Sequence, residues 1–282
     1  YDIFSEGKTY RTRARGNFRK KGQTPLVGDY VEFKADNENE GYVLKILERK
    51  NQLVRPPVAN VDCAIVVTAC VEPDFSSNLL DRQLVMLSEN EIVPILYFSK
   101  ADLMDETTKE RMLPVFDYYS KYYRTVVSEK NMADEELVSA LLEEAGNVLV
   151  VMGQTGAGKS TLLNRLDPKL KLETGEISKA LSRGRHTTRK VSLMDVKGHL
   201  IADTPGFSSF ELREIEKERL SSLFEDFNEY SPQCRFRGCL HLNEPDCAVK
   251  AAVLEGKILE SRYENYKLFQ KMIQEQKPRY KR

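Results

Sequence analysis

The sequence predicts an α/β fold in which a mostly parallel sheet domain is flanked by a small N-terminal β-barrel and a C-terminal, mostly helical domain. Up to about residue 57, short stretches alternate apolar and polar residues between glycines, which is typical of antiparallel strands. From Val61 onwards, strand-like and helix-like segments alternate, and after residue 213 charged helical sequence surrounds three cysteines and a histidine. We therefore predict domains over residues 1–57, 58–213 and 214–282.

The periodicity places the elements of each part. In the first part, residues 30–33 and 42–46 alternate as strands of an antiparallel barrel. In the second, residues 63–68 form a continuous apolar run, as a strand covered on both faces requires. The remaining strands are expected at 93–98, 124–127, 148–152, 190–196 and 199–203, and the helices at 79–91, 106–121, 134–145 and 159–166. Pro114 interrupts the second of these helices. Such alternation indicates a parallel sheet with helices on both faces.

Composition excludes several classes of protein. The chain has 282 residues, 41% of them hydrophobic and 30% charged, as in ordinary globular domains. No run approaches the roughly 18 apolar residues of a membrane helix, and no signal peptide is evident. We therefore expect a cytoplasmic protein without a membrane partner. Its 43 basic and 43 acidic residues cancel, so net charge predicts no nucleic-acid partner, and only a local patch could.

A phosphate-binding loop follows the predicted strand 148–152 and precedes the helix 159–166. The pattern G-x-x-x-x-G-K-[ST] is met by Gly153, Gln154, Thr155, Gly156, Ala157, Gly158, Lys159 and Ser160, with Thr161 next. Glycines let backbone N–H groups surround an anion, and the helix N-terminus adds its positive dipole end. Lys159 is expected to reach the β- and γ-phosphates, and Ser160 to ligate Mg²⁺. The segment is a nucleotide site.

Two further motifs select guanine. Asp203-Thr204-Pro205-Gly206 matches the D-x-x-G element, whose Asp holds Mg²⁺ through water and whose Gly senses the γ-phosphate. Ser99, Lys100, Ala101 and Asp102 resemble N-K-x-D, whose carboxylate pairs with guanine N1 and N2 hydrogens that adenine lacks. Ser99 replaces the usual Asn, which braces the phosphate-binding loop and the base. Ser128 is expected to contact guanine O6 through its backbone.

The order of these motifs is unusual, because the base-recognition elements precede the phosphate-binding loop. Ordinary GTPases have the reverse order. A fold tolerates this circular permutation when its original termini lie close together at the surface. The sequence therefore predicts a circularly permuted P-loop GTPase domain, in which the segment after Gly206 leads directly into the C-terminal domain and transmits γ-phosphate contacts to it.

The C-terminal domain carries a metal-binding pattern. Cys234, Cys239, His241 and Cys247 supply three thiolates and one imidazole within 14 residues. Four such ligands close a tetrahedral site, so we expect one structural Zn²⁺ with no position for a catalytic water. The ion would stabilise a segment too short to build its own core. Cys63 and Cys70 are expected to be buried apolar residues.

These motifs together resemble the RsgA (YjeQ/YloQ) family of circularly permuted GTPases over essentially the whole chain. The resemblance is carried by Ser99–Asp102, Gly153–Thr161, Gly184–Arg189, Asp203–Phe207 and the Cys/His cluster. It implies an N-terminal OB-fold and a monomeric, ribosome-stimulated GTPase that binds GTP and GDP. It also implies a role in late maturation of the small (30S) ribosomal subunit, with rRNA as a partner. Thr188, with Thr187 as the alternative, would complete the coordination of Mg²⁺.

The residue that drives hydrolysis is not the usual one. Ras-like enzymes use a Gln after D-x-x-G to orient water, and here that position is Phe207. His186 is the candidate within the chain, since imidazole can orient water near neutral pH; alternatively, it contacts rRNA or solvent. Arg183, Arg185 and Arg189 are available to neutralise phosphate charge, or simply form a solvated loop. A missing Gln predicts slow intrinsic turnover and activation by the partner.

A basic segment in the N-terminal domain suggests RNA. Residues 8–21 contain seven cations and no acid, with Tyr10 and Phe18 among them, a mixture that suits single-stranded RNA, although a solvated face is the alternative. The tail 277–282 is also basic. Two other functions stay open: a nucleotide-gated RNA-binding module whose hydrolysis is incidental, which Phe207 permits, and a P-loop ATPase or kinase, which Asp102 opposes.

Overall fold

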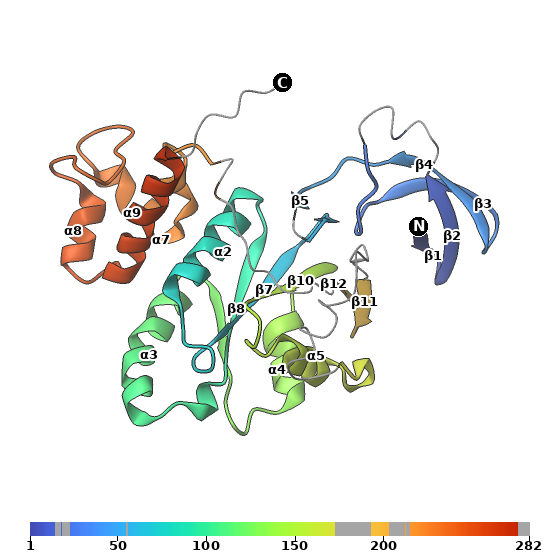
Figure 1. The fold of residues 1–282 in the computed structure, drawn as a ribbon, viewed down its shortest axis with the longest axis horizontal. Helices are drawn as coiled ribbons and strands as arrows, with labels where there is room; N and C mark the ends of the chain where they lie inside the picture. The colour runs from blue at the N-terminus through green and yellow to red at the C-terminus, as the bar shows by residue number, and fades with distance from the viewer. Residues whose placement is uncertain are drawn as a thin grey trace.

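The computed structural model describes residues 1–14, 18, 23–54, 56–172, 193–202, 212 and 215–275. In these residues a central sheet domain lies between an N-terminal sheet, blue in Figure 1, and a C-terminal group of helices, orange and red. The two flanking parts are on opposite sides of the central sheet. No helix among the described residues is long and apolar enough to cross a membrane.

The N-terminal sheet has the strand order β1-β2-β4-β3. Its strands are β1 (Asp2–Ser5), β2 (Lys8–Ala14), β3 (Val31–Asn37) and β4 (Glu40–Ile46). The expectation of a wholly antiparallel sheet was wrong for one pair, because β2 and β4 run parallel. From β2 the chain reaches the far edge to form β3, and the β3–β4 hairpin then returns β4 beside β2. Side chains alternate between the two faces of a strand in parallel and in antiparallel pairing alike. The apolar–polar pattern of the sequence therefore does not reveal the direction of a strand.

A two-stranded hairpin connects this sheet to the central domain. It pairs β5 (Gln52–Leu53) with β6 (Val58–Ala59). The Asn51 side chain both donates to and accepts from the backbone of Val61, at 2.8 Å each. These bonds fix the entry of the chain into the first central strand.

The central sheet has the order β11-β12-β10-β7-β8-β9, and only β11 is antiparallel to its neighbour. The strands are β7 (Cys63–Ala69), β8 (Val93–Ser99), β9 (Arg124–Val127), β10 (Val148–Met152), β11 (Leu193–Val196) and β12 (His199–Ala202). The helices are α2 (Ser77–Glu89), α3 (Glu106–Ser120), α4 (Asp134–Leu142) and α5 (Lys159–Leu166), with short 3₁₀ turns η1 (Ala101–Leu103) and η2 (Pro168–Leu170). Separate apolar cores contain α2 and α3 on one face and α4 and α5 on the other. The predicted doubly covered parallel sheet is confirmed.

Strand order determines where a ligand can bind. The chain starts in the middle with β7, proceeds outward through β8 and β9, and then returns to the other side of β7 with β10. Such a reversal opens a crevice at the carboxyl ends of the two central strands. The loops that follow β7, β8, β9 and β10 all emerge at this edge.

Helix α3 continues through Pro114, although proline removes one hydrogen bond from a helix interior. The helix carries Met112, Phe116, Tyr118 and Tyr119 into the core. Burial of a large side chain contributes about 1.5–3 kcal/mol, so the four together offset the roughly 3 kcal/mol that an internal proline costs. The proline therefore did not interrupt the predicted helix.

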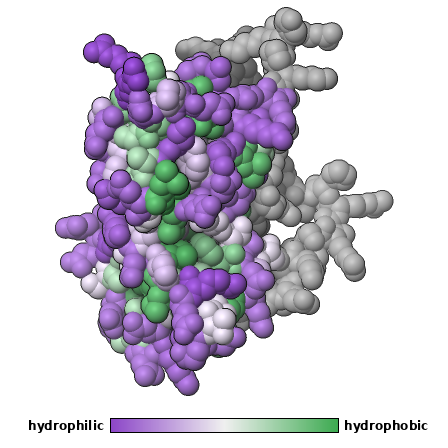
Figure 2. Space-filling model, turned by 90° about the vertical axis from the view of Figure 1, so that its left-hand side faces the viewer, coloured by the Kyte–Doolittle hydropathy of each residue, from purple (hydrophilic) through white to green (hydrophobic). Residues whose placement is uncertain are grey.

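The C-terminal domain consists of η3 (Leu220–Leu223), α7 (Glu225–Tyr230), η4 (Ser231–Gln233), α8 (Ala248–Leu254) and α9 (Glu260–Gln274). Its apolar core surrounds Phe224, Phe227 and Tyr266 and also includes Leu212 and, from α2, Val85. The outer face on this side of the molecule is largely hydrophilic, with apolar groups in smaller patches between the polar ones (Figure 2). A helix of the central domain thus completes the core of the C-terminal domain.

A buried ionic network joins the two domains. The Arg262 guanidinium on α9, 1% exposed, contacts Asp226 of α7 with both Nε (2.9 Å) and Nη2 (2.8 Å) and Asp81 of α2 with Nη1 (2.5 Å). Tyr118 and Tyr119 of α3 each donate a phenolic hydrogen to one of the carboxylates, at 2.5 and 2.6 Å. Burial raises the pKa of Asp81, so this carboxylate depends on its donors to remain ionised. We call these five residues the Arg262 network.

Arg262→Ala is expected to destabilise the C-terminal domain by about 3–5 kcal/mol, because it leaves two buried carboxylates without their counter-charge. Chemical denaturation followed by far-UV circular dichroism measures the change. Arg235→Ala is the matched control, since Arg235 pairs with Asp246 in an exposed pair at 2.8 Å and should cost less than about 1 kcal/mol. Equal losses in the two variants would contradict a structural role for the network.

Candidate functional site

The phosphate-binding loop follows β10 directly and ends at the first turn of α5. At Gly153, φ is 145°, and an added Cβ would lie 2.1 Å from the carbonyl oxygen of Val67 in β7. Glycine is required there, because any side chain would collide with the central strand. Gly158 has φ of 92° and precedes α5. The loop is therefore packed against β7, with the N-terminus of α5 open to an anion.

Lys159 is directed back over this loop. Its Nζ donates to the carbonyl oxygens of Gly153 and Gln154, at 2.8 Å each. Ser160 and Thr161 follow it in the first turn of α5. The ammonium group and the two hydroxyl-bearing residues are thus together at the end of the loop where a phosphate charge would be held.

Ser99 contacts the phosphate-binding loop from the end of β8. Its hydroxyl donates to the carbonyl oxygen of Ala157 at 2.6 Å and is buried. The usual Asn at this position braces both the loop and the base, and the serine keeps the contact with the loop. Ser99, which is shorter than Asn and has a single donor, therefore keeps the contact with the phosphate-binding loop.

The rest of this element is fixed by Ser128. Its Oγ accepts a hydrogen bond from the Ala101 amide at 3.0 Å, and its own amide donates to the Phe98 carbonyl at 2.8 Å. Asp102 follows within η1 and is exposed. Burial, with a smaller effect of the Asp102 charge, raises the pKa of the neighbouring Cys70 thiol to about 12, so this cysteine is inert. The elements at 99–102, 128 and 153–161 are therefore adjacent, as expected.

One contributor was not found from the sequence. Lys100 Nζ donates to the Glu72 carbonyl, and an added Cβ at Gly156 would lie 3.5 Å from Pro73 Cδ. The loop of residues 70–76, between β7 and α2, thus borders both the base-recognition element and the phosphate-binding loop. No sequence motif identifies this loop, because it contacts the site through the Glu72 carbonyl and the position of its backbone and not through a characteristic side chain.

Several predicted residues lie outside the described part of the chain. They are His186, Thr187, Thr188, Asp203, Gly206 and Phe207, together with the arginines at 183, 185 and 189. Their roles remain predictions.

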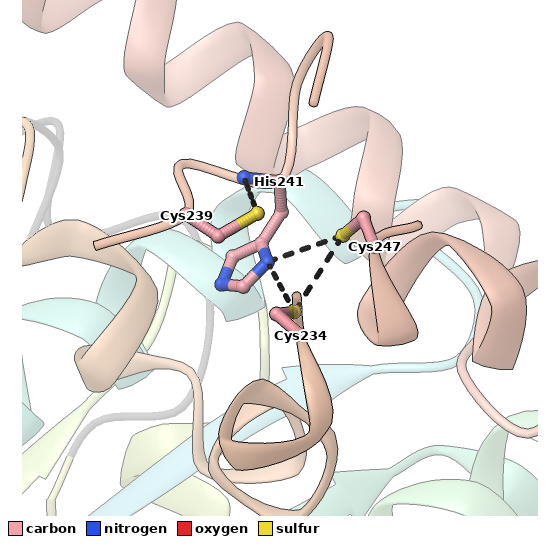
Figure 3. Close-up of side chains that lie close together, drawn as sticks. All are labelled: Cys234, Cys239, His241 and Cys247. Carbon is pink, nitrogen blue, oxygen red and sulfur yellow. Dashed lines mark hydrogen bonds between the residues drawn. The ribbon is translucent and has the colours of Figure 1, made fainter. Parts of the chain in front are cut away.

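The four predicted metal ligands converge in the C-terminal domain (Figure 3). Their ligand atoms all lie within 4.8 Å of one another. His241 Nδ1 lies 3.6 Å from Cys234 Sγ and 3.3 Å from Cys247 Sγ, and the two sulfurs are 3.9 Å apart. Burial raises the pKa of the Cys239 thiol to about 12 and lowers that of His241, so a cation is needed to hold the sulfurs as thiolates. The donor set fits a metal ion.

Surrounding groups orient these ligands. Ser231 Oγ lies 3.2 Å from His241 Nε2 and donates its own hydrogen to the Phe227 carbonyl at 2.7 Å. Nε2 must therefore donate, which leaves the lone pair on Nδ1, the nitrogen that faces the sulfurs. Tyr263 donates to the His241 carbonyl at 2.7 Å. The histidine is thereby fixed both by its ring and by its backbone.

The exposed face of the N-terminal sheet differs from expectation. Phe18 is 7% exposed, so the prediction that both rings stack on RNA was wrong for Phe18; Tyr10 is half-buried and packs 5.2 Å from the Phe33 ring. Tyr42 is exposed instead, directly opposite Arg13 on β2 and Lys34 on β3.

A parallel α/β sheet whose base-recognition element precedes its phosphate-binding loop, with both at one edge, defines the class of circularly permuted P-loop GTPases. Residues 46–213 match the family described as RsgA GTPase, and residues 1–43 match the RsgA N-terminal domain. The chain belongs to the RsgA GTPase family, and it is accordingly a GTP-hydrolysing enzyme.

Relatives and solved structures agree over nearly the full length. The chain is 56% identical to the small ribosomal subunit biogenesis GTPase RsgA of Limosilactobacillus reuteri, covering 100% of this chain and 96% of the relative. It is 50% identical to the protein of that name from Streptococcus pneumoniae, covering 100% and 94%. Among solved structures it resembles YloQ, a circularly permuted GTPase, with 40% identity and a TM-score of 0.81 over 99% of this chain and 93% of that one. It also resembles YjeQ from Thermotoga maritima, with 35% identity and a TM-score of 0.82 over 96% of this chain and 93% of that one.

Gly153→Ala is expected to weaken GDP binding by about tenfold or more, equal to about 1.4 kcal/mol, since the methyl group must displace the loop from β7. Titration with a fluorescent GDP analogue measures it. Gly198→Ala is the matched control: φ there is +87° but an added Cβ meets nothing within 4 Å, so only backbone strain is introduced. Weakened binding in the control as well would attribute the effect to general strain.

Proposed function

We propose that this protein is a GTPase switch that acts in late maturation of the small ribosomal subunit and is stimulated by it. The observation that carries the proposal is the brace between Ser99 and Ala157, which ties a base-recognition element to a phosphate-binding loop in permuted order. The names of the RsgA relatives supply the ribosomal role. We further propose a monomeric, cytoplasmic protein with domains at 1–57, 58–213 and 214–282.

The proposed residue roles combine the geometry of the phosphate-binding loop with the motifs of the sequence. Backbone amides of residues 153–158 and the ammonium of Lys159 hold the phosphates, and Ser160 ligates Mg²⁺. Asp203 and Thr188, or Thr187, complete the magnesium shell, and Gly206 senses the γ-phosphate. Asp102 selects guanine by accepting from N1 and N2, supported by its position after the buried Ala101 amide, which Ser128 fixes. The magnesium supplies charge neutralisation at the transferring phosphoryl group.

Hydrolysis requires a polar group that replaces the missing glutamine. Phe207 offers no hydrogen bond, so water must be oriented by His186 or by a ribosomal group. Either case predicts slow turnover alone and stimulation by 30S subunits. Titration of GTPase activity with 30S subunits tests the proposed function, and absence of stimulation would favour an RNA-binding module whose hydrolysis is incidental.

His186→Ala is expected to reduce 30S-stimulated turnover by about 10²-fold with little change in GTP affinity, because the imidazole acts in the transition state. Turnover at saturating 30S and affinity for 30S are measured on one preparation. His199→Ala is the control, since that ring bonds the Gly146 carbonyl at 2.6 Å, away from the loop. Normal saturated turnover with reduced 30S affinity would instead make His186 an rRNA contact.

We propose that the metal of the C-terminal domain is one structural Zn²⁺. Tetrahedral zinc with Zn–S of about 2.3 Å and Zn–N of about 2.0 Å places sulfurs about 3.8 Å apart and sulfur and nitrogen about 3.5 Å apart. The observed 3.9, 3.6 and 3.3 Å support this geometry. All four ligands come from the protein, so the ion has a structural role and takes no part in hydrolysis.

Cys239→Ser is expected to remove most of the bound zinc and destabilise the C-terminal domain, because binding free energy of a structural zinc is folding free energy. Elemental analysis and thermal unfolding measure the two effects. Cys63→Ala, in β7, should retain the metal. A wild-type protein purified without metal and fully folded would contradict the proposal.

We propose that the N-terminal sheet binds rRNA through the row Arg13–Tyr42–Lys34. A ring between two cations provides stacking for a base and charge for the flanking phosphates. Among the described residues, neither cation has an acidic partner, whereas Arg11 pairs with Asp2 and Lys45 with Glu32. Among the described residues, the row therefore carries positive charge that no acidic partner neutralises.

Tyr42→Ala is expected to weaken binding of single-stranded RNA by roughly 5- to 150-fold, the equivalent of one lost base stack of about 1–3 kcal/mol. Fluorescence anisotropy with labelled RNA measures it. Tyr30→Ala is the control, because Tyr30 is similarly exposed (56% against 49%) but precedes β3. Equal losses would exclude Tyr42 as a specific stacking platform.

A further inference from the structure

Helix α2 begins beside the nucleotide site. The loop of residues 70–76 leads into it and borders Lys100 and Gly156, as described above. Within this loop the Cys70 amide donates to the Ser99 carbonyl at 3.0 Å, and Ser76 Oγ caps α2 by accepting from the Leu79 amide at 3.3 Å. The position of the first turn of α2 therefore determines how the loop packs against the nucleotide site.

That first turn is held by a residue of the C-terminal domain. Asn265 of α9, 8% exposed, uses every hydrogen-bonding group of its amide. Its Nδ2 donates to Asp81 Oδ2 at 2.7 Å and to Ser77 Oγ at 3.2 Å, and its Oδ1 accepts from Asn78 Nδ2 at 3.0 Å. All three partners belong to α2. One buried amide thus fixes the start of this helix.

The same helix α9 also holds the metal-binding segment. Tyr263 and Tyr266 donate to the backbone carbonyls of His241 and Leu240 at 2.7 and 2.6 Å. Arg262, on the side towards α2, contacts Asp81. Helix α9 therefore contacts α2 through Arg262 and Asn265. It contacts the backbone of the metal-binding segment through Tyr263 and Tyr266.

We propose that Asn265, with Arg262 beside it, is a positioning residue of the nucleotide site. It acts through the first turn of α2 on the loop 70–76, and it makes nucleotide affinity depend on the C-terminal domain. This rests on the proposed function. Coupling of binding free energies is reciprocal, so bound nucleotide stabilises α9 in return. The route is separate from the one through the segment after Gly206.

Asn265→Ala tests the proposal without removing a buried charge. We expect the Kd for GDP and the KM for GTP to rise about fivefold or more, the lower range of such couplings, with kcat within about twofold of wild type. Gln270→Ala is the matched control. Gln270 is also buried on α9 (1% exposed), but it donates only to the Lys217 carbonyl and to Tyr266 Oη, inside the C-terminal domain. It should lower the melting temperature and leave nucleotide affinity unchanged.

Hydrogen exchange provides an independent readout on the full chain. GDP should slow exchange at residues 153–160 and also at 260–274 in the wild type and in Gln270→Ala, but only at 153–160 in Asn265→Ala. A Pro73→Ala variant changes the same loop from the opposite end, and its effect on Kd should be less than additive with that of Asn265→Ala.

Three results would overturn the inference: an unchanged Kd in Asn265→Ala, equal weakening in Gln270→Ala, or protection of 153–160 without 260–274 in the wild type. Absence of any nucleotide protection in the wild type would instead overturn the proposed function, and the inference with it. If Asn265→Ala does not fold, its effect on Kd cannot be compared with that of Pro73→Ala. The inference then stands or falls on whether GDP slows exchange at residues 260–274 in the wild type.

Discussion

The parallel pairing of β10 with β7 is the constraint on which the nucleotide site depends. It places the phosphate-binding loop so close to the central strand that only glycine fits at position 153, where a Cβ would lie 2.1 Å from the Val67 carbonyl. The same central strand pairs with β8, whose last residue, Ser99, bonds back to Ala157. Because these contacts depend on strand neighbours and not on chain order, the base-recognition element can precede the phosphate-binding loop without loss of geometry.

Helix α2 belongs to the central domain and also contributes to the C-terminal domain. In this chain the first crossover helix of the sheet contributes Val85 to the core of the C-terminal domain and Asp81 to the Arg262 network. A buried ion pair is weak evidence for stability, since desolvation opposes the attraction. Here the Arg262 guanidinium also lies over the rings of Phe224 and Tyr119, 4.7 and 5.5 Å from their centroids. Two tyrosine hydroxyls donate further hydrogen bonds to the carboxylates. This satisfies the polar groups and fixes one arrangement of α2, α3, α7 and α9.

The Cys/His cluster and the Arg262 network are connected through α9. A domain of about 70 residues, such as 214–282, has limited apolar surface to bury, and Val85 of the shared helix α2 adds to its core. Tyr266 is part of the apolar core and also bonds the Leu240 carbonyl next to the metal ligand His241. Helix α9 therefore contacts both the segment of the Cys/His cluster, through the Leu240 carbonyl, and the start of α2, through Asn265.

The sequence by itself determined the local elements and the motif residues. Strand 148–152 and helix 159–166 have the predicted bounds, because a continuous apolar run and the glycines of the loop between them specify both locally. Strand 124–127 also has its predicted bounds. The four metal ligands were also identified from residue type and spacing, since few other roles require three cysteines and a histidine so close together. Only the tertiary structure decided the direction of β4, the burial of Phe18 and the contacts of Asn265 with α2. Each depends on which distant segment lies alongside, and neither side-chain periodicity nor residue type contains that information.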